Sequence, residues 1–405
     1  MLSVEQGQEI VLKHARPLPA ETADVTPALL GQILAADVAS DIDMPPYDKS
    51  MMDGYALRAQ DLHNGQEALE IVEEITAGKV PQRALATGQS ARIMTGAPIP
   101  INADAVVMIE RSKPVGTNRV QIEDHSVLAG QNILPKGKEM RRGEVVLSAG
   151  TLLRPQTLGT LATVGRTTAS VYPRPQVAIV PTGDEIVEVS EKPGPGQIRN
   201  GNGPMLMAQV ARAGGTPRYL GIARDREDSL RALITAGLGD PILILSGGVS
   251  AGKLDLVPGV LHNLGVEAHF HKVAMKPGKP VFFGTRDGHL VFGLPGNPVS
   301  SLVSFEAFVR PAIRKLLGKR QLERSTVQAV ALEGARSPRG IRQYRRGVLH
   351  REAGGGYGVS LVGGAGSHLI ASLALSNCLV IIPEEVTELA AGSHVTVMPL
   401  LLANR

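Results

Sequence analysis

Four short apolar runs in the second half of the chain are each followed by a polar turn. The runs cover residues 177–180, 219–222, 242–245 and 290–293. Segments with helical patterns lie between and after them, over residues 204–213, 227–236, 256–264 and 299–317. Strands that alternate with helices predict a mainly parallel sheet with helices on its faces. Because ligands in such sheets bind just beyond the carboxyl ends of the strands, we expect the four turns to converge on one crevice.

The residues of these turns are suited to an anionic ligand. The turns read Pro181-Thr182-Gly183-Asp184-Glu185, Ala223-Arg224-Asp225, Ser246-Gly247-Gly248-Val249-Ser250 with Asp255 beyond it, and Leu294-Pro295-Gly296-Asn297-Pro298. Glycines let backbone N–H groups approach a phosphate, and serine hydroxyls add donors. Glu185, Asp225 and Asp255 are candidate ligands for Mg²⁺, which favours carboxylate oxygens together with substrate phosphates. Tight turns and helix caps would account for the same residues, so the pattern alone leaves both readings open.

A basic segment over residues 272–280 carries the opposite charge. In an extended strand Lys272 and Lys276 point to the same side, and Lys279 then follows a Pro-Gly turn. The prolines at 277 and 280 favour a fixed loop directed at an anion, although a solvated basic face is the alternative. The Pro295–Pro298 turn leads into a helix whose N-terminus would itself attract an anion.

The rest of the chain predicts a multi-domain protein of the α/β plus β class. Ser3 and Gln6 form a capping-box pattern for a helix through about Ala15, and residues 1–40 are interpreted as two helices joined around 16–19. A further helix is expected from Pro155 to about residue 164. The predicted domains are a linking domain (1–43 plus 141–172), an inserted β domain (44–140), the central α/β domain (173–321) and a C-terminal β barrel (322–405).

Composition disfavours several classes of function. Aromatic residues make up 3% of the 405 residues, there is no Trp and the net charge is +4, so nucleic acid is not an expected partner. No run approaches the ~20 apolar residues of a membrane span, and no signal-peptide pattern opens the chain. The single cysteine, Cys378, lies in an apolar segment and is predicted to be buried, which suits the cytoplasm. His269 and His271 alternate and could share a face, but no third ligand is evident for zinc.

Taken together and in order, the motifs resemble the molybdopterin molybdenumtransferase family, of the MoeA and gephyrin E-domain type. The matching stretches are residues 48–56, 93–100, 181–185, 197–204, 246–250 with Asp255, 273–280, 294–300 and 366–368. The resemblance implies an elongated four-domain homodimer whose active cleft lies between the α/β domain of one subunit and the β domain of the other. It implies insertion of molybdenum from molybdate into adenylylated molybdopterin, dependent on Mg²⁺, with release of AMP. Contact with the molybdopterin adenylyltransferase is a possible further partnership.

The resemblance assigns roles residue by residue. It implies that the catalytic positions are Asp53, Thr95, Glu185, Asp225, Asp255, Lys272 and Lys276. It implies that the substrate-binding positions are Ser246, Gly247, Gly248, Ser250, Lys279, Pro295, Gly296, Asn297, Pro298, Arg346 and Ser367, and that Glu185, Asp225 and Asp255 hold the metal. The chain departs from the family at Glu139 and Lys253, where other residues are common.

Two other functions remain open at this level. A molybdopterin adenylyltransferase would need only the region of residues 173–320, and the additional domains disfavour it. A non-catalytic scaffold of the same fold would not need the carboxylates and lysines that this chain retains. Nothing in the sequence separates molybdate from tungstate, since the two oxyanions are nearly equal in size.

Overall fold

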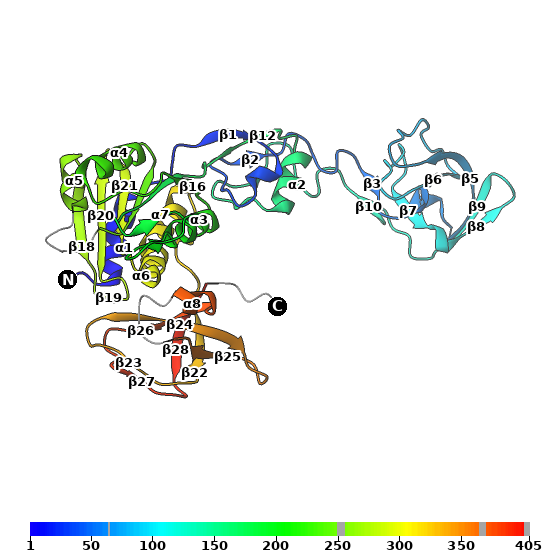
Figure 1. Cartoon of the computed structure of the whole chain (residues 1–405). Helices are drawn as coiled ribbons and strands as arrows, with labels where there is room; N and C mark the ends of the chain where they lie inside the picture. The colour runs from blue at the N-terminus through cyan, green and yellow to red at the C-terminus, as the bar shows by residue number, and fades with distance from the viewer. Residues whose placement is uncertain (64, 249–255, 364–369, 401–405) are drawn as a thin grey trace.

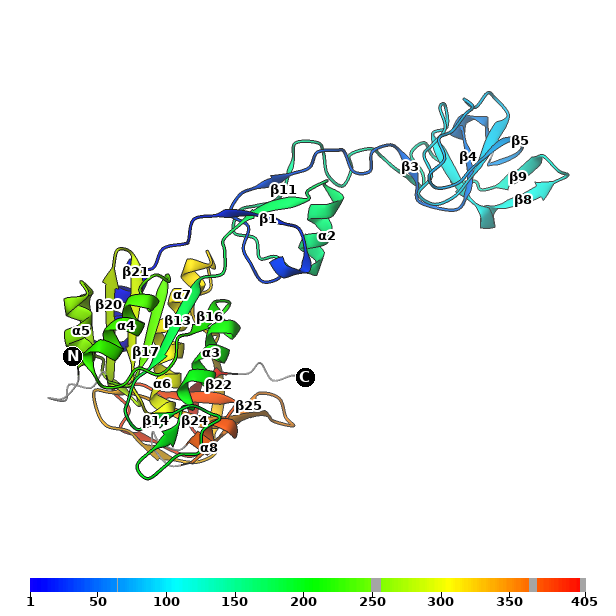
Figure 2. The ribbon, with the colours of Figure 1, turned by 45° about the horizontal axis from the view of Figure 1, so that its top comes forward.

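The molecule is elongated, with a central α/β region and a β barrel at one end and a small β domain at the other (Figures 1 and 2). A computed structural model describes residues 1–63, 65–248, 256–363 and 370–400. Three predicted site residues, Ser250, Asp255 and Ser367, lie outside the described residues. Among the helices that are described, none is long and apolar enough to cross a membrane.

The central sheet confirms the predicted α/β architecture. Its six strands run in the order β16 (Thr216–Tyr219), β13 (Gln176–Pro181), β17 (Ile242–Ser246), β21 (His289–Leu294), β20 (Pro280–Arg286) and β18 (Glu267–Lys272). The first four are parallel, and β20 and β18 are antiparallel additions at one edge. Strand β16 begins three residues before the predicted run of 219–222. Gly221 has φ +98°, which interrupts the extended conformation inside that run.

Helices cover both faces of this sheet, as its unbroken apolar strands require. On one face lie α1 (Val4–His14), α3 (Asn202–Ala213), α6 (Pro298–Ser304) and α7 (Arg310–Leu316), and on the other α4 (Glu227–Gly237) and α5 (Val257–Asn263). The predicted capping box of α1 is present, with Ser3 and Gln6 each accepting from the other's backbone N–H. The predicted long final helix is divided by a π-helical segment, η4 (Phe305–Val309), which directly precedes the Pro311 region.

The linking segment differs from its prediction. The prediction of a second N-terminal helix is wrong. Strand β1 (Glu21–Asp24) pairs instead with β12 (Thr168–Val171), and β2 (Val38–Ala39) pairs with β11 (Val145–Leu147). A short 3₁₀ turn, η1 (Pro27–Leu29), lies between β1 and β2. Prolines at 17, 19 and 27 remove backbone donors that a helix would need, so the chain remains extended. The predicted helix is present as α2 (Pro155–Thr163), with Pro155 at its first position.

The inserted β domain is reached through the short pair β3 (Lys49–Ser50) and β10 (Ile133–Leu134). Its sheet runs β7 (Ala105–Met108), β4 (Gly54–Leu57), β6 (Gln89–Ile93), β5 (Gln66–Ile75), β9 (Arg119–Glu123) and β8 (Ser112–Val115), with 3₁₀ turns η2 (Ala59–Asp61) and η3 (Ile109–Arg111). Two apolar clusters pack against this sheet, and both are mainly aliphatic.

The C-terminal strands close into the predicted barrel. They run β24 (Arg342–Arg351), β25 (Tyr357–Leu361), β22 (Val327–Ala331), β28 (His394–Pro399) and β26 (Cys378–Ile382), and β26 pairs back to β24. Smaller elements are β23 (Ala335–Arg336) with β27 (Glu388–Leu389), β14 (Ile186–Val187) with β15 (Ile198–Arg199), and α8 (Ile370–Ala374). The strand β19 (Met275–Lys276) comes from the α/β region and pairs with β24. Cys378 is buried as predicted, and burial raises its pKa to about 12.

All six phenylalanines of the chain lie between residues 270 and 308, and each is at most 6% exposed. Phe283 is central to this group. Its ring centroid lies 5.1 Å from that of Phe292, 5.6 Å from that of Phe270 and 5.4 Å from that of His269. The α/β region therefore holds all the phenylalanines, and those of its sheet lie on β18, β20 and β21, towards one edge.

We expect Phe283→Ala to destabilise the protein by about 3–5 kcal/mol, because a buried ring is lost and the cavity is only partly refilled. Urea unfolding measures the change in the free energy of unfolding. Val189→Ala is the matched control, since Val189 is 54% exposed and its truncation should cost at most about 0.5 kcal/mol. Equal losses in the two variants would contradict the assignment of Phe283 to the central core.

Candidate active site

A pocket of about 380 Å³ lies at the carboxyl ends of the parallel strands. The strands end at one level, because Pro181 pairs with Ser246 and Ser246 pairs with Leu294. All four polar turns contribute to the walls, which are lined by Thr182, Gly183, Glu185, Ile186, Ile198, Asp225, Gly247, Gly248, Pro280, Pro295, Gly296 and Asn297. The structure thus brings together the turn residues that the sequence singled out, apart from those outside the described part of the chain.

Gly247 is required by the close approach of two turns. It has φ +106°, and a Cβ at this position would lie 2.4 Å from the carbonyl oxygen of Thr182. Its own N–H donates to the carbonyl oxygen of Leu294 at 3.0 Å and is not free to bind a ligand. The Thr182 hydroxyl is buried in the same place, and it has no hydrogen-bond partner among the described residues. At this wall the Thr182 hydroxyl, and not the Gly247 N–H, is therefore the group that can bind a ligand.

Asn202, which the sequence analysis did not single out, joins two of the turns. Its side-chain N–H groups donate to the Ser246 hydroxyl at 2.9 Å and to the Gly296 carbonyl at 2.7 Å. Ser246 is itself 1% exposed, so it supports the pocket from behind. Two residues earlier, Asn200 accepts from the Gly203 N–H at 2.8 Å at the start of α3. No local sequence pattern indicates that an amide at the start of α3 bonds two turns that are distant in sequence.

Two carboxylates lie on one wall of the pocket, on neighbouring turns. Arg224 ties these turns together by donating to the carbonyl oxygens of Asp184 and Ile186, at 3.2 and 2.8 Å. Glu185 folds over Gly183, where a Cβ would lie 2.5 Å from its Oε2 atom. Asp225 is exposed, and its N–H donates to the Asp184 carboxylate at 3.1 Å.

The two carboxylates of the pocket, Glu185 and Asp225, suit Mg²⁺ better than a metal that is held by protein ligands alone. No group of three or more His, Cys, Asp or Glu residues within the described ranges is arranged to hold a metal ion. The third predicted carboxylate, Asp255, lies outside those ranges. Mg²⁺ commonly takes one or two carboxylates and completes its shell with water and substrate phosphate, which Glu185 and Asp225 would allow.

The basic segment is not one extended strand, so the predicted alignment of Lys272 with Lys276 is wrong. Lys272 ends β18 and pairs with Pro280, whereas Lys276 belongs to β19 and pairs with Gln343 of the barrel. The pairing of β18 with β20 is irregular on both sides of Phe270, and the chain then turns sharply between the two sheets. A loop is closed here, because the Val273 N–H donates to the Lys279 carbonyl oxygen at 3.1 Å.

Lys276 and Arg346 meet where the α/β region contacts the barrel. Both line a narrow gap of about 10 Å³ together with Pro277 and Val299. Arg346 is 5% exposed, and burial followed by the charge of Arg345 lowers its pKa. Lys272 and Lys279 are exposed. The predicted helix after the proline-rich turn is α6, which begins at Pro298. Because Pro280 lines the main pocket, this basic loop connects the pocket to the cations at the barrel.

Asp53 and Thr95 lie together in the inserted β domain. The Asp53 Oδ1 atom accepts hydrogen bonds from the Thr95 N–H at 2.7 Å and from its hydroxyl at 2.8 Å. These two bonds, the backbone one first, lower the pKa of Asp53. Figures 1 and 2 place β4 and β6 at the far end of the molecule from β13 and β17. Within one chain, Asp53 and Thr95 are therefore not brought to the pocket.

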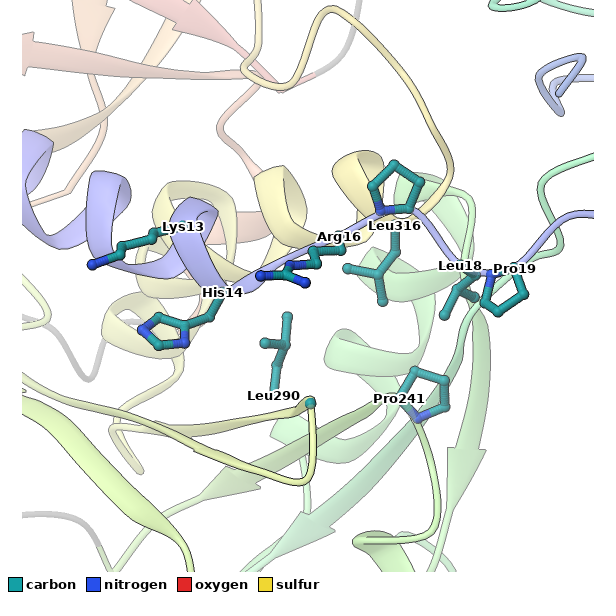
Figure 3. A pocket seen from close by; sticks show the side chains of 10 residues that line it. Lys13, His14, Arg16, Leu18, Pro19, Pro241, Leu290 and Leu316 are labelled. Carbon is teal, nitrogen blue, oxygen red and sulfur yellow. The ribbon is translucent and has the colours of Figure 1, made fainter.

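A second cavity, of about 330 Å³, lies at the opposite, amino-terminal ends of β17 and β21 (Figure 3). It is lined by Arg16, Leu290 and Pro241 among others, and it contains none of the predicted site residues. At one side, the rings of His14 and His269 stack with centroids 4.1 Å apart. His269 packs on Phe283 and His271 on Phe282, which face different cores, so the two histidines do not share a face.

Three family models together match most of the chain. They are the MoeA N-terminal region (domain I and II) over residues 2–165, a probable molybdopterin binding domain over 178–315, and the MoeA C-terminal region (domain IV) over 328–400. The chain is 37% identical to molybdopterin molybdenumtransferase 2 of Mycobacterium tuberculosis, covering 99% of this chain and 100% of that protein. It is 35% identical to the molybdopterin molybdenumtransferase of Bacillus subtilis, covering 91% and 87%.

Solved structures agree with the sequence relatives. A crystal structure of a molybdopterin biosynthesis MoeA protein from Pyrococcus horikoshii superposes with a TM-score of 0.86 at 31% identity, covering 99% of both chains. A second structure of such a protein from that organism gives a TM-score of 0.82 at 29% identity, covering 98% of this chain and 100% of that one. The likeness extends over every domain of the chain.

We expect Gly247→Ala to be more damaging than Gly221→Ala. Both glycines have positive φ, +106° and +98°, so both substitutions carry a backbone strain of about 1–3 kcal/mol. Only at position 247 does the added Cβ meet backbone, whereas position 221 has nothing within 4 Å. Urea unfolding of the two variants measures the difference. If the two variants lose the same stability, the turns do not approach as closely as described.

Proposed function

Because the chain belongs to the MoeA family of molybdopterin molybdenumtransferases, we propose that it inserts molybdenum into molybdopterin during biosynthesis of the molybdenum cofactor. The main support is the identity of 32–37% to relatives that bear this name, over nearly the full length of the chain. The pocket at the carboxyl ends of the sheet supplies a place for the chemistry, since it combines carboxylates, glycine turns and a nearby basic loop.

We further propose that the substrate is adenylylated molybdopterin and that AMP is released. An oxygen nucleophile, from molybdate or water, would form a bond to the phosphate of molybdopterin as the bond between the two phosphates breaks, and negative charge would develop on the departing AMP phosphate. Lys276, Lys279 and Arg346 are placed to stabilise anionic oxygens of the diphosphate or of molybdate. The buried hydroxyl of Thr182 lies in the main pocket at the carboxyl ends of the strands.

Glu185 and Asp225, with Asp255 as a further candidate, would hold a Mg²⁺ ion against the substrate phosphates. When bound, the ion would supply positive charge for the diphosphate oxygens. The carboxylates would otherwise repel the substrate, since they line the same pocket and are exposed. A metal requirement is therefore the simplest way for an acidic wall to accept a diphosphate.

We propose a homodimer in which the inserted β domain of one subunit completes the pocket of the other. The argument is the distance that separates Asp53 and Thr95 from the sheet within one chain (Figure 1). Asp53 retains a lowered pKa although it is exposed, so it is an ionised carboxylate at neutral pH that a partner could present. We place the protein in the cytoplasm, since its only cysteine is buried and can form no disulfide within the chain.

The test is to incubate the protein with adenylylated molybdopterin, molybdate and Mg²⁺ and to follow AMP release. We expect release that depends on both molybdate and Mg²⁺, and Glu185→Gln should raise the Mg²⁺ concentration needed for half-maximal rate. Glu188→Gln is the control, because Glu188 accepts from the Tyr219 hydroxyl at 2.7 Å and does not line the pocket. Formation of adenylylated molybdopterin from ATP would favour an adenylyltransferase instead. Binding without turnover would favour a scaffold.

The shared site predicts complementation between inactive variants. Asp53→Asn and Glu185→Gln should each lose most activity, because each removes a charge from the proposed site. Both variants should remain folded, because both positions are exposed. Mixed and re-equilibrated, they should recover activity, since half of the sites in a mixed dimer combine one intact half from each chain. No recovery, when subunit exchange has been demonstrated by a tagged subunit, would exclude the shared site while leaving the transferase assignment to the assay above.

A further inference from the structure

A group of positive side chains surrounds the point where α7 ends and the chain crosses towards the barrel. Arg310, Arg314 and Lys319 come from α7 and the residues after it. Gly318, just after α7, lies against Tyr172, since a Cβ at Gly318 would lie 2.4 Å from the Tyr172 ring. This contact brings Arg174, two residues after Tyr172 and just before β13, to the end of α7, and Arg324 follows in the linker to β22. We call Arg174, Arg310, Arg314 and Lys319 the junction cluster. It lies beside the amino-terminal end of β13, at the opposite end of that strand from the pocket of the proposed reaction.

One nearby carboxylate is already committed to other cations. Glu306, in the π-helical segment η4, has a side chain only 5% exposed. It binds Arg324 at 2.6 Å, lies 3.7 Å from Arg310 and accepts from Gln209 at 3.2 Å. This single negative charge therefore neutralises Arg324 and at most part of the charge of Arg310.

The arginines of the cluster also bind neutral carbonyl groups. Arg310 donates to the carbonyl oxygen of Leu322 at 2.9 Å, and Arg314 donates to that of Gln321 at 2.7 Å. Arg174 donates to the carbonyl oxygen of Leu30 at 2.8 Å. The first two bonds hold the linker against α7, and all three orient the guanidinium groups. They use only some of the N–H donors of each group, and a carbonyl does not cancel its positive charge.

The contacts that hold the linker against α7 explain the positions of the arginines but not that of Lys319. Within the described residues its amino group has no hydrogen bond or ion pair. Burial, followed by the charges of Arg314, Arg174 and Arg310, lowers its pKa to about 8. Geometry agrees, because the Lys319 N–H donates to the Arg314 carbonyl oxygen at 3.0 Å and so holds Lys319 at the last turn of α7. A half-buried ammonium at this cationic helix end is unfavourable unless an anion is also present.

We propose that the junction cluster is a binding site for a doubly charged tetrahedral oxyanion, either free or as the terminal phosphate of a small molecule. Planar guanidinium groups that are already oriented by backbone carbonyls match the oxygens of such an anion, and an ammonium adds a point charge. The ligand would neutralise the cluster and bridge α7, the linker and the segment before β13. This site is separate from the proposed transferase pocket and does not depend on the proposed reaction.

The test compares two lysines on the same stretch of chain. Binding of radiolabelled inorganic phosphate is measured by equilibrium dialysis at low ionic strength, for wild-type protein, Lys319→Gln and Lys315→Gln. We expect Lys319→Gln to weaken phosphate binding at least tenfold. Its midpoint of thermal unfolding without phosphate should be equal to or higher than that of wild type, because a repelling charge is removed.

Lys315→Gln is the control with the opposite expectation. The amino group of Lys315 donates to the Leu12 carbonyl oxygen at 2.6 Å, so its loss should lower the unfolding midpoint and leave phosphate affinity unchanged. Competition with AMP separates the two sources: displacement of the label indicates a phosphate carried on a nucleotide, and no displacement indicates the free oxyanion. Unchanged phosphate affinity in Lys319→Gln, or a loss of stability like that of Lys315→Gln, would overturn the proposal.

Discussion

The in-register pairing of β13, β17 and β21 is the constraint on which the rest of the molecule depends. Hydrogen bonds place Pro181, Ser246 and Leu294 side by side, so three turns begin at one level. A slip of one residue would move a turn by about 3.3 Å and send each side chain to the other face. The register is held by two different cores, because alternate residues such as Val177 and Ala178 belong to opposite faces. Core packing thus sets the geometry of a site whose polar turns lie outside both cores.

Elements that depend on local pattern were predictable from the sequence. Alternating strand and helix signals indicated the parallel sheet, and Ser3 with Gln6 marked the start of α1. Prediction failed where the outcome depends on pairing over long distance. The segment after His14 became a strand because β12 is there to pair with it, more than 140 residues later. Lys272 and Lys276 separated because β24 of the barrel takes β19 into a second sheet.

The candidate site was predicted to the extent that strand ends carry it. The turns with Glu185, Asp225 and Gly247 come directly after predicted strands, and the structure gathers them around one pocket. Asn202 could not be found this way, since its role is to bond two turns that are distant in sequence. Asp53 and Thr95 came from a resemblance and not from pattern, and their roles stay predictions. Within the described part of one chain, β4 and β6 lie at the far end of the molecule from the pocket, so these two residues do not reach it.

The chain leaves the linking segment and returns to it at almost the same place. The Met44 N–H donates to the Met140 carbonyl oxygen at 2.8 Å, and the Met140 N–H donates back to Met44 at 3.2 Å. About a hundred residues are thus enclosed in a loop whose two ends are already fixed side by side, and closing that loop adds little strain to the segment that carries it. An insertion anchored in this way can change in length, charge or sequence over evolution without disturbing the strands at its base. The part of the molecule that lies farthest from the sheet can therefore vary without altering the sheet, apart from the residues that the proposed shared site requires.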